Sequence, residues 1–232
     1  MKLLALDTST EYCSAALWLN GEVRAERVHA GQSHSALLLP MVDGLLNQAG
    51  MGLRELDGIA YGAGPGSFTG LRIACAVTQG LALGADLPVL GVSTLASIAQ
   101  QTSAARVLAV LDARMNEVYW AAYERTPEGW MCLGEPMLSK PESVVLPDNR
   151  VWSGAGNGLT LLHSAVAAPL EAQYPEIMPD AAAIASLAAP AFARGEGIDA
   201  ALAAPIYLRD KVAFTADERR LKANPVPLAQ SA

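Results

Sequence analysis

The sequence has few basic residues and no basic cluster of the kind that binds nucleic acid directly. It contains 16 lysines and arginines against 23 acidic residues, which gives a net charge of −7. Neutralising phosphates supplies most of the affinity of nucleic-acid-binding proteins. The densest basic group, Arg219, Arg220 and Lys222, stands beside Asp217 and Glu218. We therefore expect any role in RNA chemistry to depend on a partner that contacts the RNA.

Cysteine is also scarce, and nothing marks the chain for export. Cys13, Cys75 and Cys132 are far apart and form no CxxC motif, which is typical of buried, reduced thiols rather than disulfides or a metal site. Asp7 interrupts the apolar run that a signal peptide would need, and no stretch approaches a membrane span. The expected location is the cytoplasm, without contact to a membrane.

Recognisable catalytic motifs are missing as well. The histidines, His29, His34 and His163, have no metal-ligand spacing, and there is no GxSxG motif. His34 lies between two serines, but no neighbouring residue would orient a triad, so a place at the start of a helix is the stronger interpretation. We expect no catalytic residue and no bound metal in this chain.

The apolar residues make up 52% of the chain, enough for a large core, and they fall in short runs. Residues 2–7 (KLLALD) predict a buried strand that ends at an acid. Residues 13–20 and 22–28 predict a hairpin around Asn20-Gly21. Asn-Gly is favoured at such a turn because both central residues need positive φ.

The second half of the chain repeats two landmarks of the first half in the same order. Residues 106–112 (RVLAVLD) end in Asp as residues 2–7 do. The GAG at 62–64 recurs at 154–156, with another glycine two residues later in each case. Two kinds of recurring landmark predict two structurally similar lobes.

The two predicted lobes join near residues 100–105, which are polar or small. We assign residues 1–104 to the first lobe and residues 105–222 to the second. The Pro-rich, polar residues 223–232 are predicted to form a disordered tail.

Two predicted helices of the first lobe are unusually apolar. Residues 33–49 carry one apolar stripe, which packing on the chain's own sheet would also explain. Residues 68–84 are apolar nearly all round, with Arg72 and Gln79 as the clear polar positions, so this helix is expected to be buried on several sides. We favour a partner or dimer interface on these helices over pure core. The predicted interface residues are Leu38, Met41, Val42, Leu45, Leu71, Arg72, Cys75, Ala76 and Gln79.

Residues at the carboxyl ends of the predicted strands could face a nucleotide. Ligands of open α/β folds bind at this edge, and glycines at the start of a helix let backbone N–H groups approach a phosphate. The loop at 62–70 (GAGPGSFTG) is neither a P-loop nor a GxGxxG sequence, so a tight turn for close helix packing is the alternative. The candidate nucleotide-facing residues are Asp7, Thr8, Ser9, Gly64, Gly66, Ser67, Asp112, Gly154 and Gly156.

Six segments together resemble the bacterial TsaB (YeaZ) family, in order over residues 3–213. These segments are LALDTST at 4–10, SHSALLLPMVD at 33–43, GPGSFTGLRIACAVTQGLA at 64–82, GVSTLASIA at 91–99, VLAVLDARMNEVYWAAY at 107–123 and PIYLRDKVA at 205–213. The resemblance implies the α/β actin/Hsp70/sugar-kinase fold, also called the ASKHA or ribonuclease H-like fold, with two lobes built on a duplicated core.

The same resemblance implies a non-catalytic subunit that binds and activates a TsaD-like catalytic subunit. A TsaE-like ATPase joins through the complex, which attaches a threonylcarbamoyl group to N6 of adenosine 37 in tRNAs reading ANN codons. The expected contact with tRNA is indirect, no cofactor is bound firmly, and ATP or ADP enters at the level of the complex. The isolated chain could form a homodimer through the same helices.

One departure from the catalytic relatives fits a non-catalytic role. TsaD-like enzymes hold a metal with an HxxxH motif, and the corresponding stretch here places Ser93 and Ser97 at those positions. Two hydroxyls are a poor site for a transition metal. The rival hypotheses are a stand-alone ATPase or kinase of the same fold, with Asp7 as its best carboxylate, and, ranked lowest, an M22-type glycopeptidase.

Overall fold

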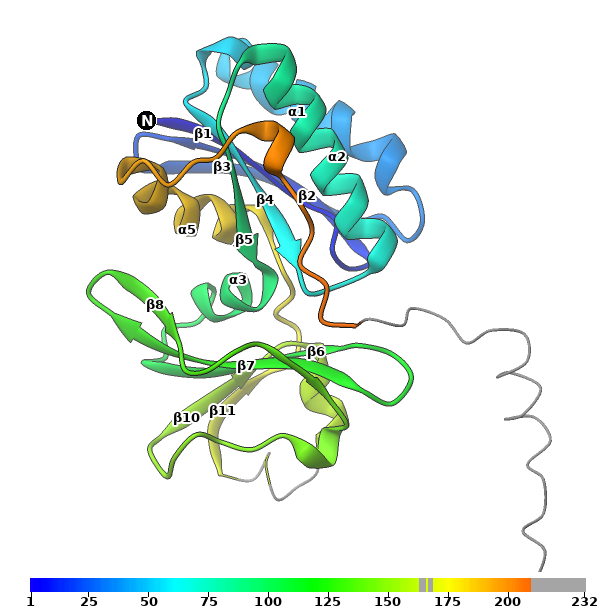
Figure 1. Cartoon of the computed structure of the whole chain (residues 1–232), viewed down its shortest axis with the longest axis vertical. Helices are drawn as coiled ribbons and strands as arrows, with labels where there is room; N and C mark the ends of the chain where they lie inside the picture. The colour runs from blue at the N-terminus through cyan, green and yellow to red at the C-terminus, as the bar shows by residue number, and fades with distance from the viewer. Residues whose placement is uncertain (163–165, 167–168, 210–232) are drawn as a thin grey trace, which may run out of the picture.

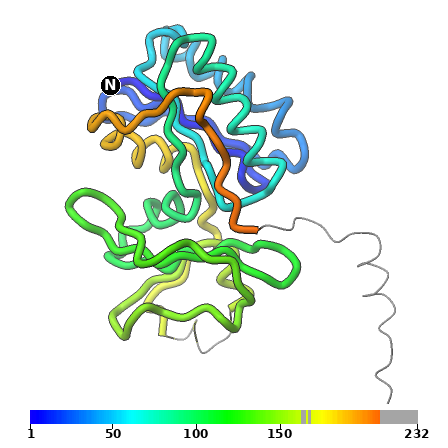
Figure 2. Tube along the Cα trace, viewed as in Figure 1, coloured from blue at the N-terminus to red at the C-terminus, as the bar shows by residue number. Residues whose placement is uncertain are grey.

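A computed structural model describes residues 1–162, 166 and 169–209, so the predicted tail at 223–232 lies outside the described residues. The chain forms two lobes, one above the other in Figure 1, each built around a β-sheet. The tube in Figure 2 shows that the chain after β11 (Leu170–Tyr174; yellow to orange) returns to the first lobe and lies beside segments from the first half of the chain.

The sheet of the first lobe has five strands in the order β3-β2-β1-β4-β5. The pair β1–β2 and the pair β2–β3 are antiparallel, whereas β4 lies parallel to β1 and β5 parallel to β4. The strands are β1 (Lys2–Asp7), β2 (Tyr12–Leu19), β3 (Glu22–His29), β4 (Gly58–Gly64) and β5 (Val89–Ser93).

The sheet of the second lobe repeats this arrangement. Its order is β8-β7-β6-β10-β11, with an additional strand β9 (Met137–Ser139) beside β7. The first three of its main strands pair antiparallel and the last two pair parallel, as in the first lobe. These strands are β6 (Arg106–Asp112), β7 (Val118–Thr126), β8 (Gly129–Cys132), β10 (Trp152–Ala155) and β11 (Leu170–Tyr174). The predicted duplication is confirmed, and the molecule has the two-lobed actin/Hsp70/sugar-kinase fold.

The predicted opening hairpin is also confirmed. Leu19 pairs with Glu22 across the turn, and Asn20 and Gly21 have φ values of 52° and 106°. Both residues tolerate this left-handed backbone region better than other residues do, so the local sequence fixes the turn and hence the register of β2 on β3.

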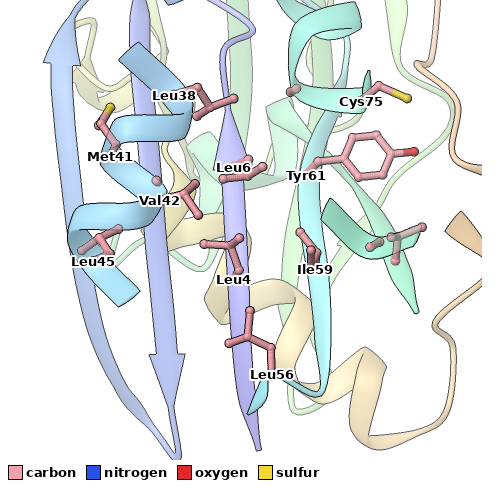
Figure 3. Close-up of a cluster of buried hydrophobic side chains, with 14 of the residues drawn as sticks. Leu4, Leu6, Leu38, Met41, Val42, Leu45, Leu56, Ile59, Tyr61 and Cys75 are labelled. Atoms are coloured by element: carbon pink, nitrogen blue, oxygen red, sulfur yellow. The ribbon is translucent and has the colours of Figure 1, made fainter. Parts of the chain in front are cut away.

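Helices cover both faces of the first sheet. Four α-helices have described bounds: α1 (His34–Ala49), α2 (Phe68–Ala85), α3 (Thr94–Gln100) and α5 (Ala181–Ala193). Short 3₁₀ turns lie at Leu53–Glu55, Pro141–Ser143, Asn157–Leu161 and Ala200–Leu202. Helices α1 and α2 share a core with one face of the first sheet, and α5 packs on the other face. In Figure 3, Leu38, Met41, Val42 and Leu45 point from α1 toward the sheet that carries Leu4 and Leu6.

The second lobe ends earlier in the chain than predicted. Sheet β1–β5 and sheet β6–β11 separate near residue 104, but the chain returns to the first lobe after β11. Ile184 of α5 is fully buried in one cluster with Leu3 and Ala60 of the first sheet, and Ile198 pairs with Val89. Much of the predicted second lobe after Asp180 therefore belongs to the first, because its apolar helix covers a sheet face that would otherwise be exposed.

Helix α2 combines unusual length with an apolar composition. Within the described residues it is the one helix that is long and apolar enough to cross a membrane, and a third of it is buried in the protein. The expectation that no stretch approaches a span is wrong in this limited sense. A core helix of a globular protein passes the same criterion, and Leu71, Ala74 and Cys75 of α2 pack in the first lobe.

Candidate functional site

A cleft of about 710 Å³ lies between the two lobes. Its first-lobe side is formed by the turn after β1, the start of α1 and the loop that begins α2; its second-lobe side is formed by the loop after β6. Four of the candidate nucleotide-facing residues line it, namely Ser9, Gly66, Ser67 and Asp112. The duplicated topology brings these loops together, because the carboxyl ends of both central strands meet here.

The first-lobe loops of the cleft are locked to each other. The backbone N–H of Ser67 donates to the carbonyl oxygen of Ser9 (2.7 Å), and the Thr8 hydroxyl donates to the carbonyl oxygen of Gly70 (2.7 Å). A Cβ at Gly66 would lie 2.6 Å from the Ser9 carbonyl oxygen. These glycines therefore serve close backbone packing, which was the alternative to a phosphate cradle.

Asp7 does not face the cleft. Its side chain is fully buried, and its Oδ2 accepts hydrogen bonds from the Ser9 hydroxyl (3.0 Å) and the Ser9 N–H (3.3 Å). Its Oδ1 has no hydrogen-bond partner among the described residues, and a Cβ at Gly62 would come within 2.0 Å of it. Burial raises the pKa of this carboxyl to about 7, against the lowering effect of Ser9. A carboxyl so placed is badly positioned to hold a metal–nucleotide complex.

The second lobe shows the same close packing at the equivalent strand ends. A Cβ at Gly156 would lie 2.1 Å from the Val110 carbonyl oxygen, and the space beside Gly154 is filled by Leu159. Asp112 pairs with Arg114 (3.1 Å), and its own N–H donates to the Asn157 side chain (2.9 Å). Of the predicted loop residues, Asp7, Thr8, Gly64, Gly154 and Gly156 thus lie behind the cleft rather than in it.

Ser93 and Ser97 are occupied by local hydrogen bonds. Ser93 caps α3 by accepting from the N–H of Ala96 (3.4 Å), and its hydroxyl lies 3.1 Å from the Tyr123 hydroxyl. Ser97 is buried and donates to the Thr94 carbonyl oxygen (2.8 Å). Within the described part of the chain, no group of three or more His, Cys, Asp or Glu side chains is placed to hold a metal ion.

The nine predicted interface residues divide into three groups. Six side chains belong to the chain's own core and form no surface: Leu38, Met41, Val42, Leu45, Leu71 and Cys75. Their assignment as contact residues is corrected, because the apolar stripe of each helix packs on the sheet beneath it. Ala76 is exposed, whereas Arg72 and Gln79 bond to the chain's own segment at 203–207.

The opposite side of α2, which we call the outer face, is apolar and available at the surface. It comprises Ile73, Ala76, Val77, Gly80, Leu83 and Gly84, which are half-buried or exposed. Leu83 is 63% exposed, and Leu39 on neighbouring α1 is 48% exposed. A sequence feature that identifies this face is the pair of glycines inside a helix. A Cβ at Gly80 or Gly84 would meet no atom of the described residues within 4 Å, so packing within this part of the chain does not require them.

Comparisons with known proteins agree with the fold and the motifs. A family model described as "TsaD: tRNA N6-adenosine threonylcarbamoyltransferase" matches residues 28–216. The Escherichia coli tRNA threonylcarbamoyladenosine biosynthesis protein TsaB is 41% identical over 92% of this chain and 97% of its own length. The Haemophilus influenzae protein of the same name is 48% identical over 54% of this chain and 55% of its own length.

A solved structure gives the same assignment. The structure titled YeaZ from Pseudomonas aeruginosa superposes with a TM-score of 0.82 at 43% sequence identity, covering 89% of this chain and 99% of that one. The shared fold, the near-complete coverage and the identity over it leave one assignment: the chain belongs to the TsaB (YeaZ) family.

Proposed function

We propose that this chain is the non-catalytic subunit of a tRNA N6-adenosine threonylcarbamoyltransferase complex. It would bind and activate a TsaD-like catalytic subunit in the cytoplasm, for modification of adenosine 37 in tRNAs that read ANN codons. The names of its relatives, which refer to threonylcarbamoyladenosine biosynthesis, support the pathway. A TsaE-like ATPase would join through the complex rather than through a nucleotide held by this chain.

The outer face of α2 is the observation that carries the proposal. A glycine inside a helix costs about 1 kcal/mol relative to alanine, and no described atom contacts the missing side-chain positions of Gly80 and Gly84. Small residues let a second helix approach closely, and the exposed Leu83 beside them offers apolar area. A helix of the catalytic subunit packed on this face would explain why its residues are both small and apolar.

Two further features support a non-catalytic role. The candidate nucleotide loops are closed by their own backbone contacts, and Asp7 is buried behind them, so the ATPase hypothesis lacks an accessible carboxylate at that position. The net charge of −7 is unfavourable for direct tRNA binding. The catalytic groups and the RNA contact would then come from the partner.

Size-exclusion chromatography with the TsaD-like subunit from the same cell tests the proposal. We expect the two wild-type chains to co-elute, and Ala76→Glu to abolish co-elution, because it buries an unpaired charge in the helix contact. A loss of about 2–5 kcal/mol from such a charge corresponds to binding that is roughly 30- to 4,000-fold weaker. Wild-type chains that never co-elute would refute the proposal.

Ala193→Glu is the matched control. Ala193 is also exposed on a helix, but α5 covers the opposite face of the first sheet, so this variant should pair normally. Circular dichroism should show both variants folded. If the isolated chain is a homodimer through the same face, Ala76→Glu should also convert it to a monomer, as light scattering would show.

A further inference from the structure

Residues 203–209, which we call the strap, follow the 3₁₀ turn at Ala200–Leu202 and run beside α2 toward the second lobe (Figure 1, orange). Hydrogen bonds of its backbone N–H and carbonyl groups fix the strap to the first lobe. The N–H of Ile206 donates to the Ala63 carbonyl oxygen (2.7 Å). The Tyr61 hydroxyl accepts from the N–H of Ala204 (3.0 Å) and lies 3.1 Å from its carbonyl oxygen.

An arginine and two aromatic rings hold the strap where it reaches the cleft. The Arg72 Nε donates to the Tyr207 hydroxyl (2.9 Å), and its guanidinium lies 3.7 Å from the centre of the Phe68 ring. The rings of Phe68 and Tyr207 are 5.5 Å apart. Contacts of this kind add to simple burial, so the strap is firmly placed on α2 before it crosses to the other lobe.

Arg209 joins the end of the strap to the second lobe. Its Nη2 lies 2.6 Å from Glu117 Oε2 and donates to the Ala113 carbonyl oxygen (3.1 Å), while Nη1 is 3.1 Å from the Met115 sulfur. Only 13% of the Arg209 side chain is exposed. A charge-assisted pair with little exposure and a second hydrogen bond is stronger than an ordinary surface ion pair.

The loop that Arg209 holds is itself strained. Arg114, Met115 and Asn116 have consecutive φ values of 61°, 58° and 59°. Asn116 tolerates this left-handed conformation, but it is unfavourable for Arg114 and Met115, which keep it only where surrounding contacts impose it. The contacts of Arg209 with Ala113 and Glu117 lie at the two ends of this loop.

The two lobes are also connected covalently by two chain segments away from the strap. The chain passes from α3 to β6 through residues 101–105 and back from β11 to α5 through residues 175–180. Gln101 ties these two passages together, because its side-chain amide donates to the Met178 carbonyl oxygen (2.7 Å). Lobes joined by adjacent segments can rotate about them, and the strap adds a third connection at the cleft that opposes this rotation.

We propose that the strap is a clasp that sets how far the two lobes open, with Arg209 as the positioning residue at its second-lobe end. Residues 206–209 line the cleft. Breaking the contacts of Arg209 with the second lobe would therefore release the strained loop and widen the cleft at the same time. The clasp acts within this chain and does not depend on any partner.

Spin-label distance measurements between the lobes test this directly. The labels go on Arg54→Cys in the first lobe and Glu128→Cys in the second, both exposed positions. The background also carries Cys132→Ser, because Cys132 is partly exposed and would react with the label. Cys13 and Cys75 are buried and can stay. We expect a narrow distance distribution for this background and a longer, broader one when Arg209→Ala is added. A distribution for Arg209→Ala that superimposes on the parent would overturn the proposal.

Arg114→Ala is the matched control, because Arg114 is 81% exposed at the same loop but pairs within it, with Asp112. It should leave the distribution unchanged, and a shift as large as that of Arg209→Ala would place the effect in the loop and contradict the clasp. Glu117→Gln should shift the distribution in the same direction by less, since the bond from Arg209 to the Ala113 carbonyl remains. This variant carries the test if circular dichroism shows Arg209→Ala unfolded.

Discussion

Thr8 donates a hydrogen bond from its side chain to the carbonyl oxygen of Gly70, over 2.7 Å, and so joins the turn after β1 to the first turn of α2. The two backbones are close enough that a Cβ at Gly70 would lie 1.8 Å from the Thr8 carbonyl oxygen. Gly70 is thus required for the approach of two backbones, whereas Gly80 in the same helix meets no described atom. The two glycines make a natural pair for mutation.

Gly70→Ala should destabilise the chain by about 1–3 kcal/mol or more, because the new methyl group forces the α2 backbone away from Thr8. Gly80→Ala should stabilise it by about 1 kcal/mol, because alanine is the better helix former and the position is open. Urea unfolding followed by circular dichroism measures both changes.

Opposite shifts of the two urea midpoints are expected, and equal midpoints would contradict the packing described for Gly70. Gly80→Ala also separates stability from function. If a partner helix packs on the outer face of α2, this variant should bind the TsaD-like subunit more weakly although it is the more stable chain.

The parts of the fold that sequence predicted are those with local causes. Asn20-Gly21 defines its hairpin through backbone preferences of two residues, and the strands that end at Asp7 and Asp112 are marked by short apolar runs. The side of a helix that faces the core is different. Leu71 and Ala76 of α2 are both apolar, and only the position of the sheet decides that the first is buried and the second exposed.

Long-range contacts explain the remaining differences between the predictions from the sequence and the structure. The helix around Ile184 follows the second sheet in the chain, and no local pattern shows that it returns to the first. Arg209 is one arginine among several in the sequence, and its contact with Glu117 joins residues far apart in the chain. The burial of Asp7 likewise depends on neighbours from β4 and α5, as the contacts of Gly62 show.

The buried carboxyl of Asp7 should make stability depend on pH in a defined direction. Its pKa is about 7 in the folded chain, against 3.8 for the free side chain. Below pH 3.8 both states are protonated. As the pH rises toward 7, the unfolded state loses its proton first, so the favourable contribution of protonated Asp7 to folding is lost. The contribution of protonated Asp7 to the free energy of unfolding is about 4 kcal/mol below pH 3.8, and it is fully lost above pH 7.

Asp7→Asn imitates the protonated carboxyl and removes this dependence. It should be more stable than wild type at pH 8 and nearly equal to it at pH 4, which serves as the internal control. Urea unfolding at several pH values between 4 and 8 gives both curves. Parallel curves would show that Asp7 does not titrate between its free and folded pKa values.

The placement of α5 on the first sheet leads to a prediction about where the chain loosens. Ile184 is fully buried against Leu3 and Ala60, so Ile184→Ala should cost about 2–5 kcal/mol. Hydrogen exchange measured by mass spectrometry should accelerate mainly in β1 and β4, because local opening follows the weakened packing. Leu108→Ala is the reciprocal control: Leu108 is fully buried in the second lobe, and its loss should accelerate exchange mainly in β6 and β10. If Ile184→Ala instead accelerated exchange in β6 and β10, α5 would belong energetically to the second lobe despite its position on the first sheet.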